Sequence, residues 1–76
     1  MRAYTYQIGE GSSDAMPKPA YSEEIHADSL GEAIDKAGAI TRLRPVHAKE
    51  SLVRLIDSSA GDYPLWASTA EEIRKG

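Results

Sequence analysis

A single helical pattern lies between two pairs of strand-like segments, and this order limits the folds open to the chain. Apolar residues recur at helical spacing across residues 30–40, and Pro45 ends the pattern. Ser29 and Glu32 stand at the spacing of a capping box, which marks a helix start. We therefore predict a helix from about Asp28 to Leu43, with one apolar stripe that needs a sheet to lie on.

Alternation of side-chain type predicts two strands before this helix and two after it. Residues 2–8 and 21–27 alternate, and residues 51–57 form the strongest strand pattern. Residues 63–68 complete a hairpin with a glycine-containing turn, and Pro64 places the last strand at an edge. The order predicts an α+β fold, a two-layer ββαββ domain with one helix on one face of a four-stranded antiparallel sheet. The expected core comprises Tyr4, Tyr6, Ile25, Leu30, Ile34, Ala37, Val53 and Leu55.

Residues 1–76 are expected to form one small α+β domain. Within it, residues 9–20 collect turn-forming residues and predict a flexible loop, and residues 68–76 predict a short C-terminal turn or tail. A chain of this length buries only about 60% of the surface that its unfolded form exposes. No cysteine is present to add a disulfide, so oligomerisation is the remaining route to stability.

The composition also bears on the compartment. The first residues lack the continuous apolar stretch of a signal peptide, and no apolar run is long enough to cross a bilayer. The chain contains neither cysteine nor asparagine, so it carries no disulfide and no N-glycosylation site. These features predict a cytoplasmic protein of bacterial or otherwise reducing origin, without a membrane partner.

One pair of residues resembles part of a metal site. Glu24 and His26 lie two positions apart on a predicted strand, so their side chains share a face. A zinc site needs three or four ligands, and His47, the other histidine, lies in a distant loop. A polar strand face that leads into a helix cap explains the same residues without a ligand, and we favour that interpretation.

No pattern specifies a catalytic site. Glu23 and Glu24 are neighbours on a strand and point to opposite faces, so they are not an acid–base pair. No Gly-x-Ser-x-Gly elbow occurs, and the glycine-rich residues 9–13 lack the Gly-Lys-Ser/Thr ending of a phosphate loop. We expect no enzymatic activity and no cofactor.

The strongest strand is apolar on both faces, whereas one helix covers only one of them. If Val53 and Leu55 lie beneath the helix, then Leu52 and Ile56 face away from it, and we expect Trp66 to join them. An exposed apolar patch of this kind marks an interface. We predict a non-enzymatic interaction module that forms a homodimer through this sheet face. The alternative is that the N-terminal loop or the C-terminal tail covers the patch.

A second candidate surface is a basic edge formed by Arg42, Arg44, Lys49 and Arg54, with only Glu50 as a counter-charge between them. The alternative function is a small regulator that binds nucleic acid or an acidic partner there. A helix C-terminus followed by a solvated loop explains the same charges. The net charge of −3 and the lack of interleaved aromatic residues disfavour nucleic acid as the partner.

Two resemblances agree with this fold. The segments YTYQI, DSLGEAIDKAGAI and LVRLIDSSAGDYPLW resemble small uncharacterised bacterial domains, which implies a ββαββ fold without an assigned activity. The first loop is longer here and contains prolines. The segment YSEEIHADSLGEAIDKAGAI is similar to the second strand and central helix of β-grasp, ubiquitin-like proteins. The chain ends in RKG without a diglycine, so this resemblance implies no conjugation role.

Overall fold

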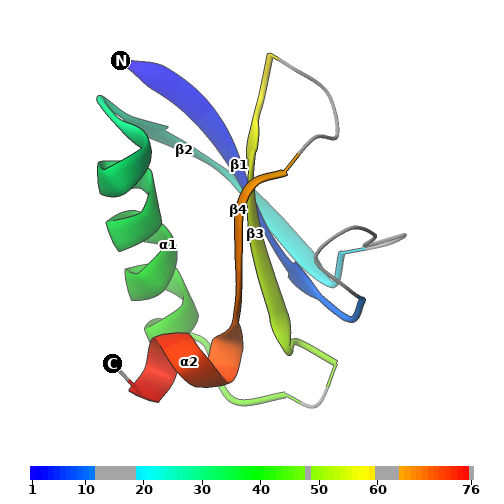
Figure 1. Ribbon diagram of the computed structural model, residues 1–76. Coiled ribbons are helices and arrows are strands. Elements are labelled where there is room, and N and C mark those ends of the chain that lie inside the picture. Colours follow the sequence, from blue (N-terminus) through cyan, green and yellow to red (C-terminus); the bar gives the residue numbers. More distant parts are fainter. Residues whose placement is uncertain (12–18, 48, 60–63, 76) are drawn as a thin grey trace.

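The computed structural model describes residues 1–11, 19–47, 49–59 and 64–75. In chain order, the elements are the strands β1 (Arg2–Gly9) and β2 (Tyr21–Ala27), the helix α1 (Leu30–Leu43), the strands β3 (Leu52–Asp57) and β4 (Pro64–Thr69), and the helix α2 (Ala70–Lys75) (Figure 1). The predicted ββαββ order is confirmed, and α2 follows it.

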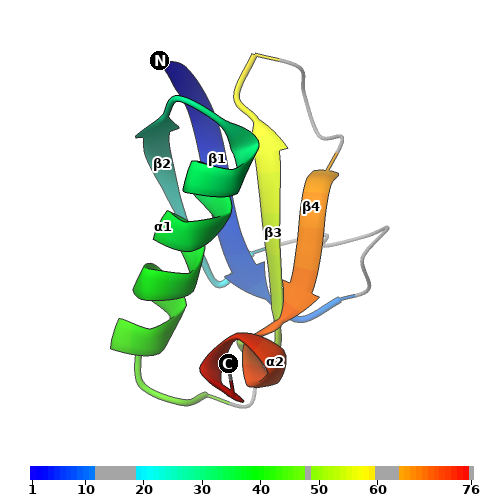
Figure 2. The same ribbon diagram turned by 60° about the vertical axis from the view of Figure 1, so that its left-hand side comes forward.

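The four strands form one sheet in the order β2-β1-β3-β4, with antiparallel neighbours throughout. Since β2 and β3 both run antiparallel to β1, they are parallel to each other on either side of it. The helix α1 links them across one face of the sheet, and β4 lies at an edge (Figure 2). The predicted α+β architecture, a helix packed on a four-stranded antiparallel sheet, is confirmed.

The helix α1 begins with the predicted cap. The Ser29 hydroxyl accepts a hydrogen bond from the Glu32 N–H at 3.2 Å, and the Glu32 carboxylate accepts one from the Asp28 N–H at 2.8 Å. Ser29 itself has an extended backbone, so the helix starts at Leu30 rather than at the predicted Asp28. It ends at the predicted Leu43, because Pro45 disfavours a helical conformation at Arg44.

The core lies between α1 and the sheet. Alternate residues of β1, Tyr4, Tyr6 and Ile8, point toward the helix and are fully buried, as are Val53 and Leu55 of β3. The other buried members are Ile25, Ala27, Ala33, Ala37, Ala70 and Ile73. Each predicted core residue belongs to this cluster or, like Leu30 and Ile34, packs against it partly buried. The small alanines of α1 leave room for the tyrosine rings beneath them.

The C-terminal residues contribute more than the predicted turn or tail. Thr69 Oγ1 accepts a hydrogen bond from the Glu72 N–H at 3.1 Å and caps α2. Ile73 is buried, and α2 packs against α1. The Arg74 guanidinium donates to the carbonyl oxygens of Thr41 and Arg44, both at 3.4 Å, at the end of α1. These contacts make α2 part of the core layer.

The predicted loop of residues 9–20 is described only at its two ends, because residues 12–18 lie outside the described residues. Gly9 belongs to β1, and the Ala20 N–H donates to the Ile8 carbonyl at 2.9 Å. A Cβ atom on Gly9 would lie 2.9 Å from the Ala20 nitrogen, so this close approach requires glycine. Neither helix in the described ranges is long and apolar enough to cross a membrane.

Candidate interaction surface at the β4 edge

Trp66 lies on the helix side of the sheet. It is the cross-strand partner of Leu55, and directly opposed residues share a face. Leu52 and Ile56 alternate with Leu55 and therefore face the other way. The prediction that Trp66 shares a face with these two residues is wrong, because the β3–β4 register, with a bulge next to Ile56, decides which face each residue of β4 takes.

The sheet face opposite α1 exposes little of its apolar surface. Leu52 is 8% exposed and Ile56 is 3% exposed, so neither offers a large contact area. Arg54 lies between them and is 5% exposed. Its Nε and Nη2 donate to Gln7 Oε1 at 3.2 and 2.7 Å. The expected exposed patch is therefore not present at these residues, and the sheet's available contact surface lies elsewhere.

The backbone of β4 has a defined orientation toward its neighbour. The Ala70 N–H donates to the Ser51 carbonyl at 2.8 Å. Ala70 and Ser51 are therefore a hydrogen-bonded pair of the antiparallel ladder, in which the backbone groups of both residues point toward each other. Hydrogen-bonded and non-hydrogen-bonded pairs alternate along an antiparallel ladder. Trp66 and Ser68 therefore direct their N–H and C=O groups toward β3, whereas Ala67 directs both of its groups away from the sheet. In the described part of the chain, no strand pairs with that outer side.

The side chains of β4 do nothing to block this edge. Residues Pro64–Thr69 include no charged residue, and Leu65 is 40% exposed. Only Pro64, at the first position, lacks an N–H group. Natural proteins protect sheet edges with charges, prolines or covering elements, since an unprotected edge pairs with other strands. Among the described residues, no strand covers this edge and no charge lies on it, and its protection is limited to Pro64 and the bulge next to Ile56.

The opposite edge, β2, is protected. The Lys36 ammonium, projecting from α1, donates a hydrogen bond to the His26 carbonyl oxygen. The β2 side chains include Glu23, Glu24 and His26, all of them exposed. Charged side chains and a lysine bound to an edge carbonyl both hinder the addition of another strand. The two edges of the sheet therefore differ in their ability to pair.

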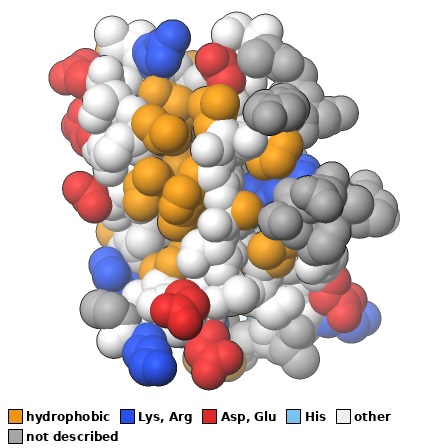
Figure 3. Space-filling model, in the orientation of Figure 1, with side chains coloured by type: hydrophobic (Ala, Val, Ile, Leu, Met, Phe, Trp, Pro, Cys, Tyr) orange, Lys and Arg blue, Asp and Glu red, His pale blue; other side chains and the backbone are white. Residues whose placement is uncertain are grey.

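A shallow apolar cleft of about 160 Å³ adjoins β4 on the helix side. Its apolar wall includes Trp66, Ile34 and Ile73, and its charged members are Asp35, Arg42 and Glu72. Figure 3 shows a strip of hydrophobic side chains between α1 and β4. Trp66 is only partly buried there, because α1 lies over the other strands and α2 reaches only the end of β4. The β4 edge together with this cleft is the candidate interaction surface, called the β4 surface below.

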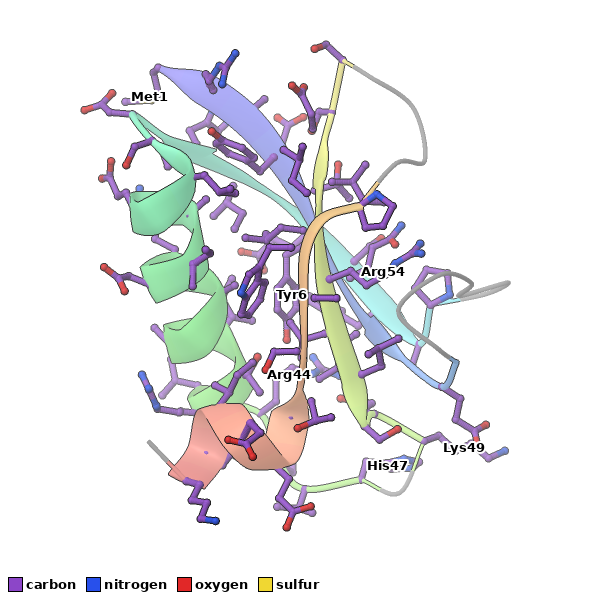
Figure 4. All side chains as sticks on the ribbon, in the orientation of Figure 1. Met1, Tyr6, Arg44, His47, Lys49 and Arg54 are labelled. Carbon is purple, nitrogen blue, oxygen red and sulfur yellow. The ribbon has the colours of Figure 1, made fainter. Side chains whose placement is uncertain are left out.

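The residues of the predicted basic edge do not gather on one surface, and Figure 4 shows Arg44, Lys49 and Arg54 at separate places. Arg44 lies beneath α1 and is paired with Glu50 through two hydrogen bonds, at 2.8 and 2.9 Å. Its guanidinium carbon also lies 4.3 Å from the centre of the Tyr21 ring. Arg54 is buried on the opposite face of the sheet, so only Arg42 and Lys49, on separate segments, present exposed charge.

The Glu24 and His26 side chains share a face, as predicted, and His26 Nε2 lies 3.0 Å from Glu24 Oε2. Both side chains are more than half exposed. Over the described ranges, no group of three or more histidine, cysteine, aspartate or glutamate residues is placed to hold a metal ion. His47 is engaged locally, since its Nδ1 accepts a hydrogen bond from the Lys49 N–H at 3.1 Å.

A larger cavity of about 700 Å³ opens between the α1–β3 loop and α2, and no sequence pattern predicts it. Val46, 81% exposed, and Leu52 are apolar residues of its lining. Its charged residues carry both signs, and Arg74 and Glu50 already bind other groups of the chain. Only the docking of α2 creates this cavity, which is why sequence patterns do not reveal it.

The chain matches no protein-family model, no curated protein and no solved structure. The functional interpretation therefore rests on the geometry described above.

Proposed function

We propose that this protein is a non-enzymatic interaction module that self-associates through its sheet, with the β4 surface as the contact. The observation that carries the proposal is the contrast between the two edges. The outer N–H and C=O groups of Ala67 lie on an uncharged edge strand, whereas Lys36 occupies an edge carbonyl of β2. The contact is thus assigned to the edge of the sheet rather than to the face bearing Leu52 and Ile56.

Energetics support self-association. Pairing of β4 with another strand would satisfy outward backbone groups, each hydrogen bond contributing about 0.5–1.5 kcal/mol net. It would also remove from water the exposed part of Trp66, a side chain of the type that dominates interface energetics. For a chain of 76 residues without a disulfide, such gains are large relative to a total stability of about 5–15 kcal/mol.

The non-enzymatic part of the proposal rests on the sequence, which specifies no nucleophile, base or metal constellation. The competing hypothesis, a regulator that binds nucleic acid or an acidic partner through Arg42, Arg44, Lys49 and Arg54, draws no support from the dispersed positions of these residues. Its distinguishing property would be binding that weakens steeply between about 50 and 200 mM salt.

The experiment is a measurement of solution mass by sedimentation equilibrium. The wild type is expected to have twice the monomer mass of 8.3 kDa at micromolar concentration, with little dependence on salt. Leu65→Lys places a charge on the β4 edge and is expected to be monomeric. The matched control is Leu43→Lys, which introduces the same charge at an 86% exposed residue of α1 and should leave the mass of the wild type unchanged. A monomeric wild type would contradict the proposal.

A further inference from the structure

The cavity of about 700 Å³ between the α1–β3 loop and α2 is separate from the cleft beside Trp66, and the two share no lining residue. Figure 1 and Figure 2 both place this loop and α2 next to each other at one end of the molecule. Its volume falls within the range of about 300–1,000 Å³ that is typical of small-molecule sites. We infer that this cavity binds a small organic carboxylate with an apolar body, a function that is independent of the proposed self-association.

The inner part of the cavity is apolar. Leu52 and Ala70 belong to its lining and are almost fully buried, so they lie at its base. Val46, also a lining residue, is largely exposed and adds an apolar side chain nearer the opening. A hydrocarbon group placed between these side chains would remove their apolar surface, and its own, from water. The base of the cavity therefore favours a ligand with an apolar body.

The charges of the lining favour an anionic ligand. Glu50 is already compensated, because Arg44 donates two hydrogen bonds to its carboxylate. The other charged residues of the described lining are Arg74, Lys75 and Glu71, which leave an excess of one positive charge. The whole chain carries a net charge of −3, so the sign of the charge at the cavity is opposite to that of the molecule. An anion is therefore attracted to this place and a cation is not.

Two lining side chains retain N–H groups that can donate to an anion. Arg74 donates through Nη2 to the carbonyl oxygens of Thr41 and Arg44, and its Nε and Nη1 make no hydrogen bond to the described residues. His47 Nδ1 accepts a hydrogen bond from the Lys49 N–H, so the neutral ring carries its proton on Nε2. Hydrogen bonds between a guanidinium and a carboxylate are among the stronger ones in proteins. A carboxylate can use these donors, whereas an ammonium group cannot.

Octanoate and octylammonium test the inference, because they share a hydrocarbon body and differ in the sign of their charge. Each is titrated into the full chain labelled with ¹⁵N, and the amide chemical shifts report both the location and the Kd. Octanoate is expected to shift the amides of Leu52 and α2, and to bind at least about tenfold more tightly than octylammonium. The net charge of −3 would by itself favour the cation, so this preference can arise only from the local site.

Two exposed apolar residues of one segment supply a matched pair of variants. Val46 lines the cavity, whereas Leu43, three positions earlier and equally exposed, does not. Val46→Asp removes an apolar contact and repels an anion, so it is expected to weaken octanoate binding at least about tenfold. Leu43→Asp adds the same charge outside the lining and is expected to change the Kd by less than about twofold, because solvent screens it. Arg74→Gln should weaken octanoate binding by about tenfold and leave octylammonium binding unchanged.

The results that would overturn the inference are specific. They are equal affinities for the two probes, equal losses in the two aspartate variants, or no shift of the amides of Leu52 and α2. Shifts centred on Trp66 and Ile34 would instead place the ligand in the other cleft and would also overturn it. None of these results changes the solution mass measured by sedimentation, so the failure of this inference and the failure of the proposed self-association are distinguishable.

Discussion

The hydroxyl oxygen of Tyr6 lies 2.9 Å from Thr41 Oγ1, in a contact that joins the middle of the sheet to α1. Both side chains are fully buried. Thr41 Oγ1 also donates to the Ala37 carbonyl at 2.9 Å, so the Tyr6 hydroxyl is the donor in the pair. The Tyr4 hydroxyl is buried as well but has no hydrogen-bond partner in the described part of the chain. Two tyrosines on one face of β1 therefore have different hydrogen-bonding environments.

Thr41→Val is expected to lower the free energy of unfolding by about 1–3 kcal/mol, because it leaves the buried Tyr6 hydroxyl without an acceptor. Urea denaturation followed by circular dichroism measures the loss. In the double variant with Tyr6→Phe, the loss should be smaller than the sum of the two single losses, since neither partner is then left unsatisfied. Tyr4→Phe is the control and should cost less than Tyr6→Phe. Additive losses would contradict the prediction.

Stability should fall in alkali because of Tyr6. Burial raises the pKa of the Tyr6 hydroxyl above its usual value, so the folded state favours the neutral phenol. The resulting stabilisation is fully present below the unfolded pKa of about 10, and it is lost as the pH rises through the higher folded pKa. Unfolding free energies between pH 8 and 11.5 should therefore decline more steeply for the wild type than for Tyr6→Phe. Parallel curves would show that ionisation of Tyr6 is not linked to folding.

Acid should remove the contribution of the Arg44–Glu50 pair. Hydrogen bonding from Arg44 lowers the pKa of the Glu50 carboxyl, so the folded state favours the carboxylate. The stabilisation is present above the unfolded pKa of about 4.3, and it is lost as the pH falls through the lower folded pKa. At pH 7, Glu50→Gln should be less stable than the wild type by about 1 kcal/mol. That difference should shrink toward pH 2, and a difference independent of pH would contradict the assignment.

Two glycines of α1 can be replaced with a gain in stability. A Cβ atom on Gly38 would lie 3.5 Å from the nearest Arg42 atom, and one on Gly31 would lie 3.9 Å from Ser29 Oγ, both ordinary contacts. Gly38→Ala and Gly31→Ala should therefore each raise the free energy of unfolding by about 0.5–1 kcal/mol, through helix propensity. Thermal unfolding measures the gain. Gly9→Ala is the opposing control, since its Cβ would meet the Ala20 backbone, and this variant should be destabilised.

Most elements of the fold follow from local patterns, which is why the sequence predicts them well. The alternation in β1 and β2 reflects a sheet with one buried face, and the structure places Tyr4, Tyr6 and Ile25 on that face. Ser29 and Glu32 form the predicted cap, because capping depends on residues only three positions apart. Local patterns predict only a turn or tail where α2 forms, because a six-residue helix has little stability of its own and is held by contacts with α1.

Local patterns predict the strand and helix segments and the apolar stripe of the helix, and the absence of charge from residues 64–69 is read directly from the chain. Which edges and faces these segments present depends on how they pack together in three dimensions. The β3–β4 register assigns Trp66 to the helix side, and the strand order makes β4 an edge. Arg44 meets Glu50, and Arg54 meets Gln7, only after the chain has folded. Periodicity shows which residues share a face of one strand or helix. The partner of a side chain, and the strand that lies at the edge of the sheet, depend on pairing between segments that are distant in the sequence. No local pattern encodes that pairing.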